Sequence, residues 1–508
     1  MKNTGEILKN STTYALATVI AQVIGVFTSI ATRRLLTPEM MGIWATFLIV
    51  LNYCLFAHIG VFTAVGVRIP YLRGKEKEEE IQAMRDTAYT FAVMISAFVV
   101  IILLIASFML KNRFDAYITL GIRVVAFVIA ATFFYNLYTV MLRADKKFHL
   151  LSKALIVNSA SMLFFVVILA YFFGLRGIYF ATFSATVISW LYLRYGSGYK
   201  LKLGFKLKQL VSLTKIGLPI LIVGIAYTLL VSIDKIMIIK MIGARELGFY
   251  SIAILAFTYT NTFPKLFGIV IFPNMQEDYG KTDSKDHIIG YVKKPAIIMA
   301  YIFPVLLAAA YFAIPVLVYY ILPKYIPGIT SMKILLAGCF FISLTPLAQN
   351  FAISINKQTV LIPMTIAAVV LGLGLNYFMI KSGYGINGVA LGTSVAYMVY
   401  FVILFYYVLK HCEKRSNILK FIMGIFLPFV YAFAIILLLE RCFHIKNIFL
   451  GAIVKASIFI VVYSPMVIYL NKKTGIITKL IKRKTSKKII VEPEAPIGVI
   501  DSAEPELL

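Results

Sequence analysis

The feature that most constrains this chain is a series of apolar segments of roughly 20 residues each, separated by short basic stretches. A segment of that length crosses the hydrocarbon core of a bilayer as a single helix. Hydrophobic residues make up 61% of the chain and charged residues 14%, against about 45–50% and about 25% in soluble domains. The sequence therefore predicts an all-α polytopic membrane protein.

The apolar segments predict fourteen transmembrane helices, arranged as two sets of six and a final pair. The first set lies near 10–32, 39–63, 87–110, 116–141, 151–173 and 177–194; the second near 214–241, 246–273, 295–321, 326–352, 359–380 and 385–409; and the pair near 419–440 and 447–470. The stretch 195–213 between the sets alternates Lys with apolar residues, which is typical of a segment lying on a membrane surface.

These segments define the expected domains. We expect an N-terminal six-helix bundle (1–194), a basic amphipathic cytoplasmic linker that acts as a hinge (195–213), a C-terminal six-helix bundle (214–410) and an extra helix pair (411–470). The remaining tail (471–508) becomes acidic after Lys488 and is expected to be disordered and cytoplasmic.

Two sequence matches indicate that the chain is a tandem duplication. Aligning Gly42 with Gly248 also aligns Arg34 with Lys240 and Trp44 with Tyr250, at an offset of 206 residues. The run Gly174 to Gly177 matches Gly385 to Gly388 at an offset of 211. Because each copy has an even number of helices, the two copies insert in the same orientation, and repeats of this kind place the substrate between the halves.

The distribution of basic residues predicts the orientation. Net charge is +28, and most of the Lys and Arg residues fall in loops on the side of the N-terminus. By the positive-inside rule, we expect a multi-pass protein of the cell membrane with both termini in the cytoplasm. No nucleic-acid-binding motif accompanies these charges, so a nucleic-acid partner is not expected. The four cysteines and five histidines are scattered, so no metal site or cofactor is expected.

Basic residues inside or next to the predicted spans are the candidate substrate-binding residues. A charge in the membrane interior is costly, and it normally faces a partner or a water-filled cavity. The candidates for binding a phosphate or pyrophosphate are Arg33, Arg34, Lys235, Lys240 and Lys265. Two alternatives stay open: Arg33 and Arg34 could reach the lipid headgroups, and Lys235 could form an ion pair with Asp234.

Polar residues at helical spacing complete the candidate cavity. Gln22, Asn261 and Gln349 lie on polar stripes of three predicted spans. The structural alternative is that such residues join packed helices by hydrogen bonds. Asp234, the single carboxylate deep in a predicted span, is a candidate for an ion pair or for ion coupling. The excess of basic groups favours an anion that resides in the membrane, such as a lipid phosphate.

The two turn motifs, RRLLTPEMMGIWA (33–45) and DKIMIIKMIGARELGFYSIA (234–253), resemble those of the polysaccharide biosynthesis proteins, the Wzx-type oligosaccharide flippases. This superfamily also includes multidrug exporters and lipid II flippases. The resemblance implies a V-shaped pair of bundles that moves a polyprenyl-pyrophosphate-linked oligosaccharide to the outer leaflet by alternating access. It implies a transporter and not an enzyme, with polysaccharide polymerase and glycosyltransferase partners.

Three other functions remain as alternatives. A lipid II flippase shares the helix number but has a different N-terminal turn. A cation-coupled drug exporter of the superfamily carries a membrane carboxylate in the N-terminal bundle, which this chain lacks. A membrane polysaccharide polymerase is disfavoured because predicted outer loops such as 381–384 and 442–446 are too short to carry a catalytic site.

Overall fold

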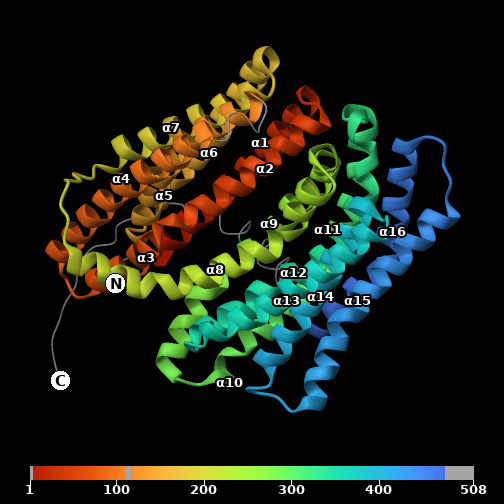
Figure 1. The fold of residues 1–508 in the computed structure, drawn as a ribbon. Coiled ribbons are helices and arrows are strands. Elements are labelled where there is room, and N and C mark those ends of the chain that lie inside the picture. Colours follow the sequence, from red (N-terminus) through yellow and green to blue (C-terminus); the bar gives the residue numbers. More distant parts are fainter. Residues whose placement is uncertain (1–3, 110–111, 113–115, 475–508) are drawn as a thin grey trace, which may run out of the picture.

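The computed structural model describes residues 4–109, 112 and 116–474, and its described regular elements are all helices. Figure 1 shows two helical lobes, with α8 crossing between them. The N-lobe contains α1 (Thr4–Leu35), α2 (Pro38–Cys54), η1 (Leu55–His58), α3 (Val61–Gly74), α4 (Glu78–Met109), α5 (Ala116–Ala144), α6 (Phe148–Phe173) and α7 (Leu175–Ser197).

The C-lobe is built from the second half of the chain and carries the extra pair on its outside (Figure 1). Its elements are α8 (Leu207–Met241), α9 (Ala244–Thr282), α10 (Lys285–Ile288), α11 (Gly290–Ile321), η2 (Pro323–Gly328), α12 (Ile329–Ser354), η3 (Gln358–Val360), α13 (Leu361–Lys381), α14 (Gly385–Leu409), α15 (Arg415–Cys442) and α16 (Ile448–Thr474). The extra pair, α15 and α16, packs against α11.

Twelve helical segments of the described chain are long and apolar enough to cross a membrane. The helices α7 and α9 are not among the twelve, but they are 23 and 39 residues long and pack against membrane-spanning neighbours. The twelve segments together with α7 and α9 account for the fourteen predicted spans. The all-helical, multi-pass membrane fold predicted from the sequence is confirmed.

The second span is longer and more broken than the sequence predicts. The expected helix over 39–63 is divided into α2, η1 and α3, and α3 continues to Gly74. Ile59 and Gly60 adopt left-handed φ values of 43° and 84° at the break. Gly60 lies directly against the backbone of Gly217 in α8, where a Cβ on either residue would clash. The break therefore lets the two lobes' backbones approach each other.

The two lobes also meet where α2 and α9 begin, which we call the Pro38 end of the molecule. A Cβ on Gly42 would lie 1.8 Å from the carbonyl oxygen of Ala244, and one on Gly248 would lie 1.7 Å from that of Pro38. The offset of 206 residues relates Pro38 to Ala244 and Gly42 to Gly248. The aligned residues thus contact each other reciprocally, as in a pseudo-two-fold interface. Only glycine allows this helix crossing at such close range.

The connection between the lobes is shorter than the expected linker 195–213, because α7 continues to Ser197 and α8 begins at Leu207. Gly198, with φ of 68°, ends α7. The connection is held against α4: the Lys202 amide donates to Asp86 at 3.0 Å and the Gly204 amide donates to Thr90 at 2.9 Å. These hydrogen bonds attach the connection to the N-lobe.

Candidate functional site

A cavity of about 330 Å³ lies between the lobes, toward the Pro38 end. Its walls come from α1, α2 and α6 of the N-lobe and from α9 of the C-lobe. The lining is mixed: apolar residues such as Trp44 and Leu48 alternate with hydroxyl and amide groups. The polar lining includes Thr28, Ser29, Asn158, Ser251, Thr258 and Tyr259, together with Arg33.

Arg33 is the charged residue of this cavity, and its side chain is almost fully buried, with 3% exposed. Its Nε donates to the Ser251 hydroxyl at 3.1 Å and its Nη2 to the Ser251 carbonyl at 2.8 Å. Its Nη1 donates to the carbonyl of Ser29 at 3.0 Å and to the Ser29 hydroxyl. The guanidinium therefore joins α1 of one lobe to α9 of the other.

These partners of Arg33 are neutral, and no described carboxylate forms an ion pair with it. Hydroxyls and carbonyls satisfy hydrogen bonds but leave the positive charge uncompensated. A buried charge without an opposite partner is costly. In a cavity between two lobes, that charge favours the binding of an anion.

Arg34, the next residue on α1, does not line this cavity. It is exposed and lines a second pocket near the Pro38 end, which Arg33 also lines. Of the five predicted basic site residues, the structure brings these two together at a shared pocket.

Lys235 and Asp234 form an ion pair inside the C-lobe. The Lys235 Nζ lies 3.1 Å from the Asp234 carboxylate and also donates to the Val231 carbonyl. Asp234 is 1% exposed and accepts a second hydrogen bond, from the Tyr250 hydroxyl, at 2.8 Å. The pairing that the sequence left open is present, and it satisfies both charges locally.

The remaining predicted site residues are dispersed. Lys240 is exposed in the last turn of α8, and Gln22 is half-buried on α1. Lys265 belongs to α9, but its side chain lies outside the described residues. Asn261 accepts a hydrogen bond from Ser343 at 3.1 Å, and Gln349 donates to Tyr400 at 3.0 Å. Asn261 and Gln349 therefore join helices of the C-lobe, as the structural alternative describes.

Sequence reasoning missed an ionic cluster that attaches the extra pair. Glu440 at the end of α15 contacts Lys333 of α12 at 2.8 Å and Lys455 of α16 at 3.3 Å. The hairpin alone does not predict the second contact, because Glu440 lies two residues before the end of α15 and Lys455 lies seven residues after the start of α16. These partners give the in-span Lys455 a structural role.

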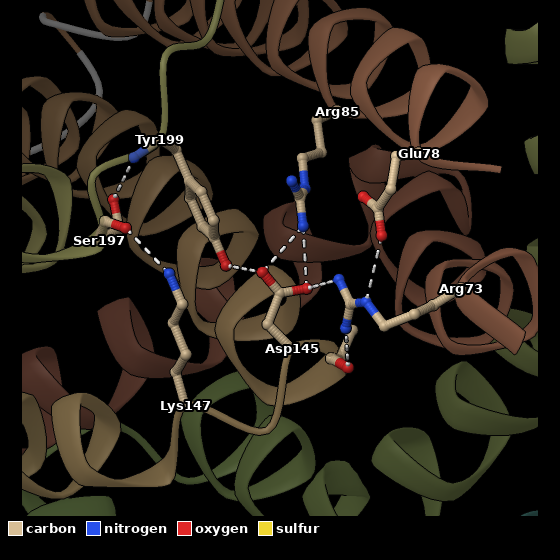
Figure 2. A network of polar contacts seen from close by, with 8 residues as sticks. Arg73, Glu78, Arg85, Asp145, Lys147, Ser197 and Tyr199 are labelled. Atoms are coloured by element: carbon tan, nitrogen blue, oxygen red, sulfur yellow. Dashed lines mark hydrogen bonds and ion pairs between the residues drawn. The ribbon is translucent and has the colours of Figure 1, made fainter. Parts of the chain in front are cut away.

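A second missed cluster surrounds Asp145, in the turn between α5 and α6 (Figure 2). Its carboxylate accepts from Arg73 at 2.7 Å, from Arg85 at 2.8 Å and from the Tyr199 hydroxyl. Burial raises the pKa of Asp145, but the hydrogen bonds from Tyr199 and Arg73 and the charges of the two arginines outweigh it and lower that pKa. The cluster ties α3, α4 and the connection after α7 to one turn.

The described residues contain no group of three or more His, Cys, Asp and Glu side chains placed to hold a metal ion. One guanidinium among hydroxyl and amide groups is a chemical environment suited to an anion.

The comparisons with known proteins agree with this arrangement. A model of the polysaccharide biosynthesis protein family matches residues 32–329. The putative O-antigen transporter of Shigella flexneri is 23% identical over 427 residues, which cover 81% of this chain and all of the relative.

Two solved structures share the fold. The lipid II flippase MurJ, in an inward closed conformation, has a TM-score of 0.69 at 12% identity and covers 91% of this chain and 99% of its own. An inward-facing multidrug resistance MATE family transporter of the MOP superfamily has a TM-score of 0.66 at 16% identity and covers 79% and 95%. Because the family match extends over more than half of the chain, this protein belongs to the polysaccharide biosynthesis protein family.

Proposed function

We propose that this protein is a flippase that moves a polyprenyl-pyrophosphate-linked oligosaccharide from the cytoplasmic to the outer leaflet, for surface polysaccharide biosynthesis. The family membership and the relative's description as a putative O-antigen transporter support this substrate class. The fold shared with a lipid II flippase and a multidrug transporter supports a path for the substrate between two lobes. The product is the substrate itself on the other side, so no covalent chemistry is required.

The observation that carries the proposal is Arg33, a buried guanidinium in an inter-lobe cavity with neutral partners. A lipid pyrophosphate brings the negative charge that this group lacks, and its glycan can form hydrogen bonds with the hydroxyls and amides of the lining. Because Arg33 contacts both lobes, anion binding there competes with the bonds that hold the lobes together. Binding would thereby be linked to lobe movement.

The proposed orientation places both termini in the cytoplasm and the Pro38 end at the outer leaflet, following the positive-inside rule. Moving negative charge outward is then favoured by an inside-negative membrane potential, by about 2.3 kcal/mol per charge per 100 mV. In this scheme 1–194 and 214–410 move as bundles, and 411–470 follows the second bundle. The connection within 195–213 joins the bundles.

The other predicted site residues have supporting roles in the proposal. Arg34, Lys240 and Lys265 would add positive charge along the lipid's path, while Gln22 would line the route. Lys235 and Asp234 would change their pairing only if the anion reaches the C-lobe. A polysaccharide polymerase and glycosyltransferases are the proposed functional partners, because they would consume and supply the lipid-linked glycan.

The test is translocation by the full-length protein in reconstituted vesicles, using a fluorescent lipid-linked oligosaccharide. We expect Arg33→Gln to lower the initial rate by about tenfold or more, because a charged hydrogen bond is worth about 1.5–3 kcal/mol. Arg33→Lys should keep part of the rate. Lys446→Gln, which removes an exposed charge between α15 and α16, is the control. A normal rate in folded Arg33→Gln protein would refute the proposal.

The second candidate is a lipid II flippase, which the fold shared with MurJ favours. The same vesicles loaded with fluorescent lipid II separate the two. A faster initial rate with lipid II than with any lipid-linked oligosaccharide would make the second candidate correct.

A further inference from the structure

We infer that the Pro38 end carries a second lipid site, which binds the phosphate or pyrophosphate of a polyprenyl lipid in a basic pocket and its isoprenoid chain in an adjoining groove. The identity of the lipid rests on the proposed function; the site itself rests on two further cavities and the residues they share. It lies where the end of α1 meets the turn from α11 into η2.

The basic pocket has a volume of about 330 Å³ and contains three cationic side chains, Arg33, Arg34 and Lys324. No carboxylate lines it, and none of the three forms an ion pair with a described carboxylate. Arg34 and Lys324 are exposed, so both can reach a bound phosphate. Three positive charges around one space produce a local field that attracts a multivalent anion.

The wall of the pocket is fixed by Tyr325 of η2. Tyr325 is fully buried, and its hydroxyl donates to the carbonyl oxygen of Leu36 at 3.2 Å. This bond holds the η2 turn of the C-lobe against the end of α1 in the N-lobe. The pocket thus takes its arginines from one lobe and its lysine from the other, so a bound anion would bridge them.

An apolar groove of about 390 Å³ begins at Arg34. Its lining consists of Arg34 and six apolar or aromatic residues of α1 and α6: Ala31, Leu35, Val167, Ile168, Tyr171 and Phe172. Tyr171 and Phe172 are largely exposed on the outer surface of the lobe. Arg34 is the one charged residue of this lining, and it stands where the groove meets the basic pocket.

Shared residues place the three spaces in series. Arg33 lines both the inter-lobe cavity and the basic pocket, and Arg34 lines both the basic pocket and the groove. A phosphate leaving the cavity would therefore pass from one guanidinium to the next. A basic pocket beside an apolar groove favours an amphipathic anion. A free phosphate would gain no apolar contact from the groove, and an uncharged lipid would gain no charge pairing in the pocket.

The test is photo-crosslinking of the full-length protein in nanodiscs with a diazirine-bearing polyprenyl phosphate, mapped by mass spectrometry. We expect label on residues 167–172. In the double variant Arg34→Gln with Lys324→Gln, this label should fall by about tenfold or more, since two charge-assisted contacts are lost. The matched control is Arg245→Gln with Lys446→Gln, which removes two exposed cations that line neither the basic pocket nor the groove and should leave the label unchanged.

Further arms identify the source of binding. Excess inorganic pyrophosphate should reduce the label by competing for the basic pocket, and the uncharged polyprenol probe should label 167–172 at least about tenfold less. Val167→Trp should reduce labelling by filling the groove. Equal labelling by the uncharged probe, or full labelling of the Arg34 and Lys324 double variant, would overturn the site.

The assay requires no translocation, so the two proposals can fail separately. If Arg33→Gln transports normally but labelling depends on Arg34 and Lys324, the site stands and the flippase proposal falls. If transport depends on Arg33 but the label maps elsewhere, the flippase proposal stands and the second site falls.

Discussion

The two lobes use corresponding positions in opposite ways. At the offset of 206 residues, Thr28 and Ser29 of α1 correspond to Asp234 and Lys235 of α8. In the C-lobe these positions hold a complete ion pair, closed by the Tyr250 hydroxyl. In the N-lobe they hold hydroxyl residues, and the cation, Arg33, comes one turn later with neutral partners. One copy pairs its buried cation with a carboxylate, and the other holds its buried cation with neutral partners.

This difference indicates how a duplicated transporter can divide its tasks. Two identical halves would each need a charge at the cavity and a means of stabilising it. Here the C-lobe ion pair is buried and locally satisfied, which is the pattern of a structural contact. The N-lobe charge is buried beside the inter-lobe cavity, where we propose that it binds the anion.

The largest expected effect is on stability, at the C-lobe ion pair. Asp234→Ala would leave the Lys235 ammonium without its carboxylate and the Tyr250 hydroxyl without its acceptor. Removing one member of a buried pair costs about 3 kcal/mol. We expect this loss in the free energy of unfolding, measured by denaturation in mixed micelles.

The double variant Asp234→Asn with Lys235→Met serves as the comparison, since it removes both charges and should be less destabilised than Asp234→Ala. If Asp234→Ala were fully stable but inactive in translocation, the carboxylate would be a coupling group, and the division between the lobes would be wrong.

The next effect is on transport, at the N-lobe. Ser29→Asp would place a carboxylate where a hydroxyl now accepts from Arg33, giving this lobe an internal ion pair like that of its counterpart. Neutralising Arg33 in place should lower translocation by about tenfold while the unfolding transition is maintained. Ser29→Ala, which removes the hydroxyl without adding charge, should transport far better. Wild-type rates in Ser29→Asp would show that the charge of Arg33 is not used.

Much of the fold could be predicted from the sequence, because helix length and hydrophobicity are fixed by the bilayer. The repeat also relates the contact of Gly42 with Ala244 to that of Gly248 with Pro38. The break at Ile59 and Gly60 could not be predicted, since it depends on the approach of Gly217 from a distant helix.

The site was only partly predictable for a related reason. Neighbouring residues on a helix point about 100° apart. Arg33 and Arg34 share the basic pocket, but only Arg33 also lines the inter-lobe cavity. The sequence does not say which of them faces inward. Likewise, the pairing of Lys455 with Glu440 depends on how α15 and α16 are aligned against each other.

The smallest expected effect tests a further asymmetry, at the opposite end of the lobes. Lys146 and Asn356 both adopt left-handed φ values, of 59° and 56°, in the turns after α5 and α12. The residue before Lys146 is Asp145 in the N-lobe, whereas the residue before Asn356 is Ile355 in the C-lobe. Only the N-lobe turn can therefore bind Arg73, Arg85 and the connection through Tyr199 (Figure 2).

Asp145→Asn should cost about 1 kcal/mol at neutral pH, less than a fully buried pair because Arg73 is partly exposed. Since folding lowers the pKa of Asp145 below its ordinary value of 3.8, the carboxylate stabilises the fold fully above that value. The stabilisation is lost as the pH falls through the lowered pKa. The difference in unfolding free energy between wild type and Asp145→Asn should therefore shrink from pH 7 toward pH 3.

Asp283→Asn, at an exposed position after α9, should show no comparable difference at either pH. If the difference in unfolding free energy between wild type and Asp145→Asn stayed unchanged at low pH, the turn would be held by its backbone and not by the charge of Asp145. The asymmetry between the two turns would then have no consequence for stability.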